Sequence, residues 1–263
     1  MRTKVQVALN GAQLHEIDES VIVQQVIEQA PTLKRATIAS GTHVGQLPTT
    51  LDRLSLDVQV VFSLRGKDDR AKRMQTLQRI AAWATDGGWL TVNYRTGERL
   101  RVECDALPNV GDIKKWNGTY TLTFRAYAVP YWQQTAANES TASAASGSVT
   151  LSRGGNAEAP LLFSYKNTGS ADVNAVTVTC AGQKIALSGL ALKPGETVAL
   201  EYDDRRNMQS IRIAGGSAAR DARPYRSADS SDDIMLRAAS NAVGYSASAA
   251  GQWTFRTFGR WRL

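Results

Sequence analysis

Hydrophobic and polar residues alternate most regularly between Leu54 and Leu64. Leu, Val and Phe occupy every second position of this stretch, with mainly Ser, Asp and Gln between them. A period of two sustained over so many residues predicts a β-strand with one buried face. A second alternating run, from Thr119 to Ala126, predicts another half-buried strand. It should stop at Val129-Pro130, because proline cannot donate a hydrogen bond to a sheet ladder.

Between these two strands the apolar spacing changes and predicts one main helix. Asp68 is placed to cap its N-terminus, and Gly87-Gly88 to end it. The apolar stripe of this helix comprises Ala71, Met74, Leu77, Ile80, Ala81 and Ala84. After the glycines, Trp89 to Tyr94 and Arg99 to Val102 flank Arg95-Thr96-Gly97-Glu98, which predicts a β-hairpin. The first half therefore forms an α+β domain.

The second half contains short β segments separated by turns. In Lys193-Pro194-Gly195-Glu196, proline presets the second position of a turn and glycine supplies the positive φ of the third. The expected strands are Leu161–Tyr165, Val173–Cys180, Val198–Tyr202, Ser210–Ile213, Ile234–Leu236, Asn241–Ser246 and Gln252–Arg256. Many short strands at close spacing predict an antiparallel β-sandwich. The fold class is therefore mostly β.

The stretch from Thr135 to Ser148 contains neither an aromatic nor a large aliphatic residue. Such a stretch cannot anchor itself in a core, so we interpret it as a linker or exposed loop. The chain then divides into an N-terminal domain at 1–134, the linker at 135–148 and a C-terminal domain at 149–263. We expect the two domains to fold independently.

The length, hydropathy and charge of the chain limit the classes of protein to which it can belong. With 263 residues and 43% hydrophobic content, it is large enough for two compact domains. It lacks a bilayer-spanning apolar run, and its basic start lacks the apolar length of a secretion signal, so we expect synthesis and folding in a cytoplasm.

The net charge of +7 is spread evenly along the chain. Residues 1–135 hold 17 Lys and Arg against 13 Asp and Glu, and residues 136–263 hold 14 against 11, which favours mixed surfaces over a nucleic-acid stripe.

Candidate catalytic residues are few. The only histidines are His15 and His43. His15 is followed by Glu16, but a helical HExxH zinc site needs a second histidine where Glu19 stands. A nucleophile elbow of the GxSxG type and a phosphate-binding loop are also missing. We therefore expect no enzymatic activity and no cofactor.

Metal and disulfide sites are similarly disfavoured. The paired carboxylates Asp203-Asp204 and Asp232-Asp233 lack the alternating oxygen ligands of a calcium loop, so we interpret them as solvated turn residues. Cys104 and Cys180 fall in different predicted domains, and neither belongs to a CxxC pair. Two reduced thiols are the better interpretation.

Two arginine-containing stretches have more than one interpretation. Arg70 and Arg73 lie on the predicted helix, where a solvated face is the commoner role and a subunit contact the alternative, because arginine is enriched at interfaces. The stretch 253–263 mixes four aromatic residues with three arginines. A final strand with Trp253 and Phe255 in the core accounts for it best. Stacking on single-stranded nucleic acid ranks lower, because no basic groove accompanies it.

The order of elements in the first half matches a known pattern. An alternating strand (LSLDVQVVFSLRG) leads into a charged helix (DDRAKRMQTLQRIAAWA), and a Gly-Gly break, a strand-turn-strand (WLTVNYRTGERLRVE) and a closing strand (TYTLTFRAYAVPYWQ) follow. This order resembles the N-terminal domain of the distal tail (Dit) proteins of long-tailed, siphovirus-type bacteriophages, over about residues 15–133. In that family the closing strand commonly ends in a Phe followed by Pro-Tyr, which Phe124, Pro130 and Tyr131 resemble.

The second half resembles the galectin-like β-sandwich that many Dit proteins carry, through Ala159-Pro160, the Lys-Pro-Gly-Glu turn and the strand at Asn241 to Tyr245. The resemblance implies a homo-oligomeric, six-fold ring in the virion tail, between the tail tube protein and tail-tip or receptor-binding proteins. DNA would pass through this ring without specific binding, so the positive charge should lie mostly away from the lumen.

The alternative function is a carbohydrate-binding β-sandwich that contacts a host glycan. Sugar sites present aromatic rings beside polar residues, and the C-terminal half offers several candidates. They are Tyr202, Tyr225, Tyr245, Trp253 and Trp261.

Overall fold

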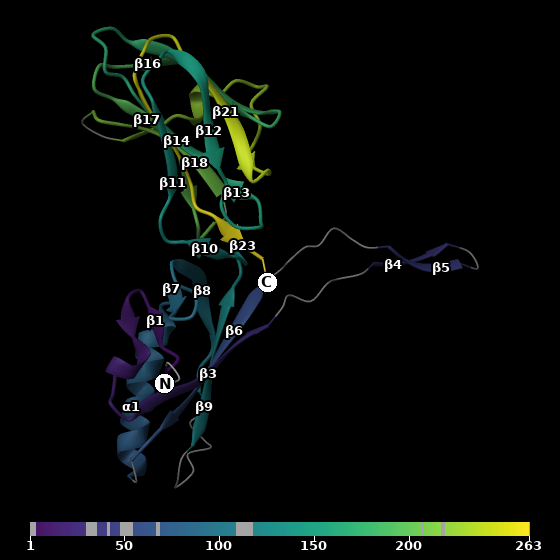
Figure 1. The fold of residues 1–263 in the computed structure, drawn as a ribbon, viewed down its shortest axis with the longest axis vertical. Coiled ribbons are helices and arrows are strands. Elements are labelled where there is room, and N and C mark those ends of the chain that lie inside the picture. The colour runs from purple at the N-terminus through teal and green to yellow at the C-terminus, as the bar shows by residue number, and fades with distance from the viewer. Residues whose placement is uncertain are drawn as a thin grey trace. The chain divides into compact units, whose positions relative to one another are not determined.

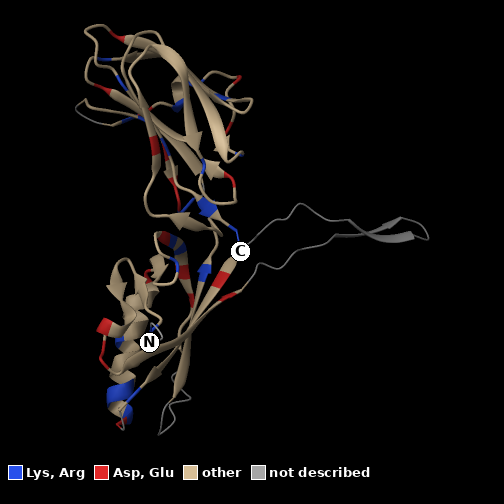
Figure 2. Ribbon diagram, viewed as in Figure 1, with Lys and Arg blue, Asp and Glu red and all other residues tan. Residues whose placement is uncertain are grey.

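The computed structural model describes residues 4–29, 36–40, 43–47, 55–66, 69–108, 118–206, 208–216 and 219–262. The chain divides into two compact units, unit 1 at residues 1–132 and unit 2 at residues 133–262 (Figure 1). Lys, Arg, Asp and Glu are interspersed along the ribbons of both units (Figure 2), as the even charge distribution indicated.

Unit 1 is built on an antiparallel sheet with the strand order β2-β1-β7-β8-β9-β6-β3. A short 3-10 helix, η1 (Leu14–Glu16), follows β2, and the α-helix α1 (Arg70–Thr85) connects β6 to β7. The strands are β1 (Val7–Leu9), β2 (Ala12–Gln13), β3 (Val21–Gln29), β6 (Leu56–Leu64), β7 (Gly88–Val92), β8 (Glu98–Ala106) and β9 (Thr119–Ala126).

The alternating strands predicted from the sequence are confirmed. Along β6, buried residues alternate strictly with half-buried ones from Leu56 to Leu64, and Phe62 is fully buried. Its neighbour β9 buries Tyr120, Leu122, Phe124 and Ala126 in the same alternation. The predicted hairpin is confirmed as well, because β7 and β8 pair with Leu90 opposite Leu100.

Helix α1 packs on this sheet, with the Trp83 ring edge-on to Phe124 at a centroid distance of 6.1 Å. Two details of the predicted helix were wrong. Its N-cap is Asp69, whose carboxylate accepts a hydrogen bond from the Ala71 N–H at 2.8 Å, while Asp68 lies outside the described residues. Ala71 is exposed, and the buried face begins with Arg73 and Thr76.

A separate hairpin lies in the long connection between β3 and β6. Its strands, β4 (Ala36–Ser40) and β5 (His43–Leu47), pair with each other from Ala36 opposite Leu47 to Ser40 opposite His43. They form a two-stranded sheet of their own.

Unit 2 is an antiparallel β-sandwich, as the sequence predicted. One sheet has the order β11-β22-β14-β17-β18-β19, and the other β12-β21-β15-β16. Its strands are β11 (Asn138–Ala142), β12 (Ser146–Ser152), β14 (Leu162–Lys166), β15 (Val173–Cys180), β16 (Gln183–Leu192), β17 (Thr197–Asp203), β18 (Met208–Ala214), β19 (Arg220–Asp221), β21 (Ser240–Ala247) and β22 (Gln252–Thr257). The short strands β13 (Ala159–Pro160) and β20 (Met235–Leu236) pair with each other. Two further short strands, β10 (Trp132–Gln134) and β23 (Arg260–Trp261), also pair.

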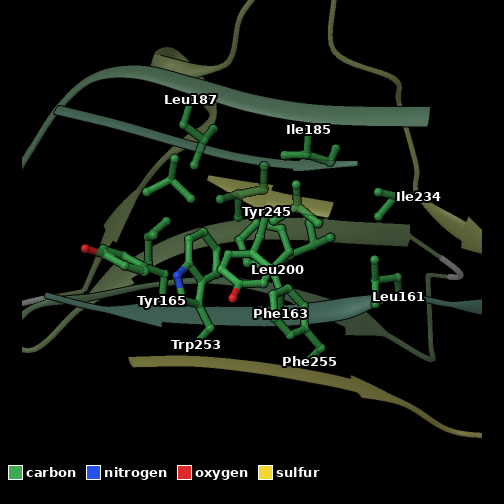
Figure 3. Close-up of a cluster of buried hydrophobic side chains, with 14 of the residues drawn as sticks. Leu161, Phe163, Tyr165, Ile185, Leu187, Leu200, Ile234, Tyr245, Trp253 and Phe255 are labelled. Atoms are coloured by element: carbon green, nitrogen blue, oxygen red, sulfur yellow. The ribbon is translucent and has the colours of Figure 1, made fainter. Parts of the chain in front are cut away.

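The sandwich core is rich in aromatic rings (Figure 3). Trp253 is fully buried and lies 4.6 Å from Tyr165 and 5.0 Å from Tyr245 between ring centroids. Phe255 stacks on Trp253 at 5.7 Å. The predicted final strand at Gln252–Arg256, with Trp253 and Phe255 in the core, is therefore confirmed as β22. The predicted turn also forms, because the Glu196 N–H donates to the Lys193 carbonyl at 3.0 Å with Gly195 at φ +84°.

The interpretation of residues 135–148 as a linker or exposed loop was wrong for residues 138–142 and 146–148, which belong to strands. Residues 138–142 form β11, which pairs with β22 from Asn138 opposite Thr257 to Ala142 opposite Trp253. Residues 146–152 form β12, which pairs with β21. Backbone hydrogen bonds hold a strand whatever the size of its side chains, so a run of small residues can be ordered when its partner strand supplies the core.

Candidate functional site

A highly connected polar cluster of unit 1 surrounds Glu28, near the end of β3. Its carboxylate accepts hydrogen bonds from Arg95 Nε at 2.8 Å and Nη2 at 2.6 Å. The Trp132 indole N–H donates to it at 2.9 Å, and the Tyr94 hydroxyl at 3.1 Å. Arg95 also donates to Glu98 at 2.9 Å and lies over the Trp132 ring at 4.6 Å from its centroid. The cluster joins β3, the β7–β8 turn and the last residue of unit 1.

A second polar cluster lies where β6, β9 and β8 are neighbours. Arg125 on β9 forms a bidentate ion pair with Asp57, its cross-strand partner on β6, at 2.7 Å and 2.9 Å. The pairing of β8 with β9 shifts register between Cys104 and Ala106, at Asp105. The Asp105 carboxylate lies 3.2 Å from the Arg125 guanidinium and accepts a hydrogen bond from the Tyr127 hydroxyl at 2.8 Å. This hydrogen bond raises the pKa of Tyr127. Such bulges redirect side chains next to binding surfaces.

Next to this cluster is a shallow depression of about 300 Å³, lined by Thr85, Cys104, Asp105 and Leu107. Burial, and then the Asp105 charge, raise the pKa of the Cys104 thiol. Because the thiolate is the nucleophilic form of cysteine, this environment disfavours covalent chemistry at Cys104. Neither Cys104 nor Cys180 takes part in a disulfide bond.

The two predicted interface arginines lie in different environments. Arg70, the first residue of α1, is exposed. Arg73 is only 3% exposed and faces the interior of unit 1. The expectation that Arg73 makes a polar contact with another subunit was therefore wrong, because almost none of this side chain is exposed to solvent. Arg70 keeps the surface that such a contact requires.

The other candidate residues occupy turns and short elements. His15 lies half-buried in η1, and the side chain of His43 lies outside the described residues. The Asp203 carboxylate accepts the Arg205 N–H at 2.9 Å and so closes the turn after β17. Within the described part of the chain, no three His, Cys, Asp or Glu side chains are grouped closely enough to hold a metal ion. The described helix is too short and too polar to cross a bilayer.

Two of the aromatic residues considered for glycan stacking are core residues. Trp253 is fully buried and donates its indole N–H to the Ala144 carbonyl at 3.0 Å, and Tyr245 is only 9% exposed. Tyr202 is half-buried, with Arg260 over its ring at 4.8 Å from the centroid. Stacking on a sugar needs an open ring face, so Trp253 and Tyr245 cannot provide it.

The Glu28 cluster could not be predicted from the sequence. Glu28 and Arg95 are 67 residues apart, and Glu28 and Trp132 are 104 apart. A charged residue near the end of a strand has no local signature that distinguishes a buried ion pair from a solvated side chain. The same holds for Asp57 and Arg125, which are 68 residues apart.

The arrangement of strands and helix in both units matches a known structure over nearly the whole chain. The SPP1 Dit (gp 19.1) protein is described as a paradigm of the hub adsorption apparatus in phages that infect Gram-positive bacteria. It superposes with a TM-score of 0.71 at 12% sequence identity, covering 97% of this chain and 98% of that one. The chain has a Dit fold.

The same Dit fold matches two structures of the phage P2 baseplate in its activated conformation. With Ca the TM-score is 0.55 at 8% identity, covering 98% of each chain, and with Sr it is 0.52 at 8% identity, covering 97% of each. At the level of the fold, the resemblance noted in the sequence is confirmed. Neither a family model nor a curated protein matches the sequence itself.

Proposed function

We propose that this chain is a structural protein of a phage tail tip or baseplate, where it forms a ring that joins the tail tube to host-attachment proteins. The observation that carries this proposal is the match to the SPP1 Dit protein across both units, with 97% of this chain and 98% of that chain covered. A match over one unit alone would support only a shared domain. The agreement of both units in the same order supports a shared architecture.

The β4–β5 hairpin supports assembly with other chains. An isolated two-stranded hairpin is at best marginally stable in water. Among the described residues, β4 and β5 pair only with each other. Because β3 and β6 already pair from Val21 opposite Leu64 to Gln29 opposite Asp57, a tight turn would suffice to connect them. The longer connection is therefore best explained by a surface on another subunit that stabilises the hairpin.

The edge of the unit 1 sheet supports a ring. Strand β3 has nine residues, ends the strand order and pairs within the described chain only with β6. Proteins either blunt such an edge or pair it with another chain. Head-to-tail contacts that close on themselves form rings. We therefore assign the ring contacts to unit 1, with six copies as the proposed number, and a monomeric state to unit 2.

The proposed partners are the tail tube protein on one side and tail-tip or receptor-binding proteins on the other, within the virion tail. DNA would pass through the ring without sequence-specific contacts. This role requires positioning of subunits and no catalytic step.

The test is the mass of the purified full-length chain over a range of concentrations, by native mass spectrometry, with negative-stain imaging of its particles. A closed ring of about six copies is expected. Adding charge to the β3 edge with Gln24→Lys and Gln29→Lys should prevent ring formation. The control is the double substitution Thr150→Lys and Ser152→Lys, which adds the same charge at two exposed strand residues of unit 2. A monomer at all concentrations, or rings unaffected by the β3 substitutions, would contradict the proposal in this form.

A further inference from the structure

Strand β16 is an edge strand whose pairing capacity is large. It has ten residues and ends the order β12-β21-β15-β16. Ile185, Leu187, Leu190 and Leu192 point into the core of the sandwich and are almost completely buried. Long edge strands with a formed apolar face are templates for pairing with another chain. A second copy of β16 placed against this edge would continue the sheet while both cores stayed covered.

The edge of β16 is covered by a segment of the same chain that is not a strand. Residues 226–231, which we term the edge guard, run along it in an irregular conformation that contains a turn at 227–230. The Ser227 N–H donates to the Ala186 carbonyl at 2.9 Å, and the Ser231 N–H donates to the Lys184 carbonyl at 2.7 Å. These bonds use the outward carbonyl groups of β16.

Serine hydroxyls cover the outward N–H groups. The Ala186 N–H donates to Ser230 Oγ at 3.0 Å, and the same hydroxyl donates back to the Ala186 carbonyl at 3.1 Å. The Lys184 N–H donates to Ser231 Oγ at 3.0 Å. Serine side chains can replace backbone groups in this way. The four outward polar groups of Lys184 and Ala186 are thus occupied without a further strand.

An ion pair also connects the edge guard to β16. The Lys184 ammonium forms an ion pair with Asp229, in the turn of the guard. Both side chains are well exposed, so this pair is weak by itself. The guard packs little apolar surface: Ser227, Ser230 and Ser231 are half-buried, and residues 228 and 229 are exposed. Its attachment therefore rests on the polar bonds to Lys184 and Ala186 and on an isolated antiparallel bridge between Arg226 and Leu187.

We propose that residues 226–231 are an autoinhibitory edge guard that prevents β16 of one chain from pairing with β16 of a second copy. The guard leaves the ring contacts of unit 1 as the route of assembly and keeps unit 2 separate from its neighbours. Antiparallel pairing of two β16 edges would be symmetric and would produce a two-fold contact, unlike the head-to-tail contact of a ring. Detaching the edge guard should therefore double the mass of the assembly, whatever the oligomeric state of the unaltered chain.

The experiment uses the full chain with the triple substitution Asp229→Lys, Ser230→Ala and Ser231→Ala. These changes remove the hydroxyl bonds and turn the ion pair into a repulsion, and they leave the buried core residues intact. The control is the double substitution Ser146→Ala and Ser148→Ala, two exposed serines of β12. Each variant is also prepared with Ser188→Cys, an exposed position on β16, for cross-linking with a bis-maleimide.

Three readings decide the outcome. In dilute protein, where the triple variant is not yet paired with a second copy, hydrogen exchange at the Lys184 and Ala186 amides should accelerate on the order of tenfold or more, because the hydrogen bonds that protect them are lost. At high concentration the mass of the variant should double, and Ser188→Cys should link two copies only in this background. Faster exchange without doubling or cross-linking would overturn the pairing role. Unchanged exchange would overturn the assignment of these three side chains to the guard.

Discussion

The guanidinium of Arg95 and the carboxylate of Glu28 form a bidentate ion pair, with Nε–Oε1 at 2.8 Å and Nη2–Oε2 at 2.6 Å. The two side chains are only 20% and 11% exposed. Bidentate geometry and partial burial make this pair stronger than most ion pairs of the surface. It also fixes Trp132, which donates to the same carboxylate. The last residue of unit 1 is thereby attached to the end of β3.

Arg95→Ala should destabilise unit 1 by about 3 kcal/mol, because it leaves the Glu28 carboxylate poorly solvated and without its cation. Chemical denaturation measures the change in the free energy of unfolding. The control is Arg256→Ala in unit 2, which removes an ion pair to Glu139 whose side chains are 54% and 41% exposed, and which should cost at most about 1 kcal/mol. Equal effects of the two substitutions would show that the Glu28 cluster contributes no more than a surface pair.

Tyr94 should make the stability of unit 1 sensitive to alkaline pH. Burial, the Glu28 charge and the hydrogen bond to Glu28 raise the pKa of Tyr94 from 10.0 to about 12. A raised pKa in the folded state stabilises the protein fully below pH 10, and this contribution is lost as the pH rises from 10 to 12. Unfolding free energies measured between pH 9 and 11.5 should therefore fall more steeply for the wild type than for Tyr94→Phe. An equal pH dependence of the unfolding free energy in the two proteins would rule out a contribution from the ionisation of Tyr94.

Phe62→Ala should destabilise unit 1 by about 3–5 kcal/mol, through lost transfer free energy and the cavity that remains. Phe62 is fully buried and stacks on Tyr120 at a centroid distance of 5.6 Å, and Leu77 of α1 is buried in the same unit. The control is Gln59→Ala on the opposite face of β6, which should change stability by no more than about 0.5 kcal/mol. Thermal and chemical denaturation both test this difference.

Gly88→Ala should be far more costly than Gly97→Ala, although both glycines have positive φ. A Cβ at Gly88 would lie 2.1 Å from Asn10 Oδ1, whereas a Cβ at Gly97 would meet no atom within 4 Å. Asn10 cannot easily move, since it accepts the Trp89 N–H at 2.9 Å and donates to the Gly87 carbonyl at 3.0 Å. The backbone cost alone is about 1–2 kcal/mol at each site, so denaturation should show that loss for Gly97→Ala and a larger one for Gly88→Ala.

Fragments 1–132 and 133–263 should each fold independently, because each unit has its own core. The fragment 149–263 should not fold well, since it lacks β11 and the start of β12. Circular dichroism and cooperative denaturation of the three fragments test this prediction. A folded 149–263 and an unfolded 133–263 would place the boundary where composition alone suggested it.

The sequence predicted those elements whose signal is local. Alternation along β6 and β9, the helical spacing of Leu77, Ile80 and Ala84, and the Pro-Gly turn after β16 each depend on a few consecutive residues and the geometry they prefer. Local signals did not decide between adjacent residues that suit the same role equally well. Asp68 and Asp69 both suit an N-cap by composition, and only the backbone path selects Asp69.

Only the tertiary structure decided which distant residues meet. Arg73 is buried although its sequence context matches that of the exposed Arg70 and Lys72. Strand β11 forms although it contains no aromatic or large aliphatic side chain, because β22 supplies the pairing and the aromatic core. The Glu28 cluster and the edge guard on β16 join residues 44 to 104 positions apart. Periodicity records the preferences of neighbouring residues, whereas the satisfaction of buried charges and strand edges depends on the packing of the whole unit.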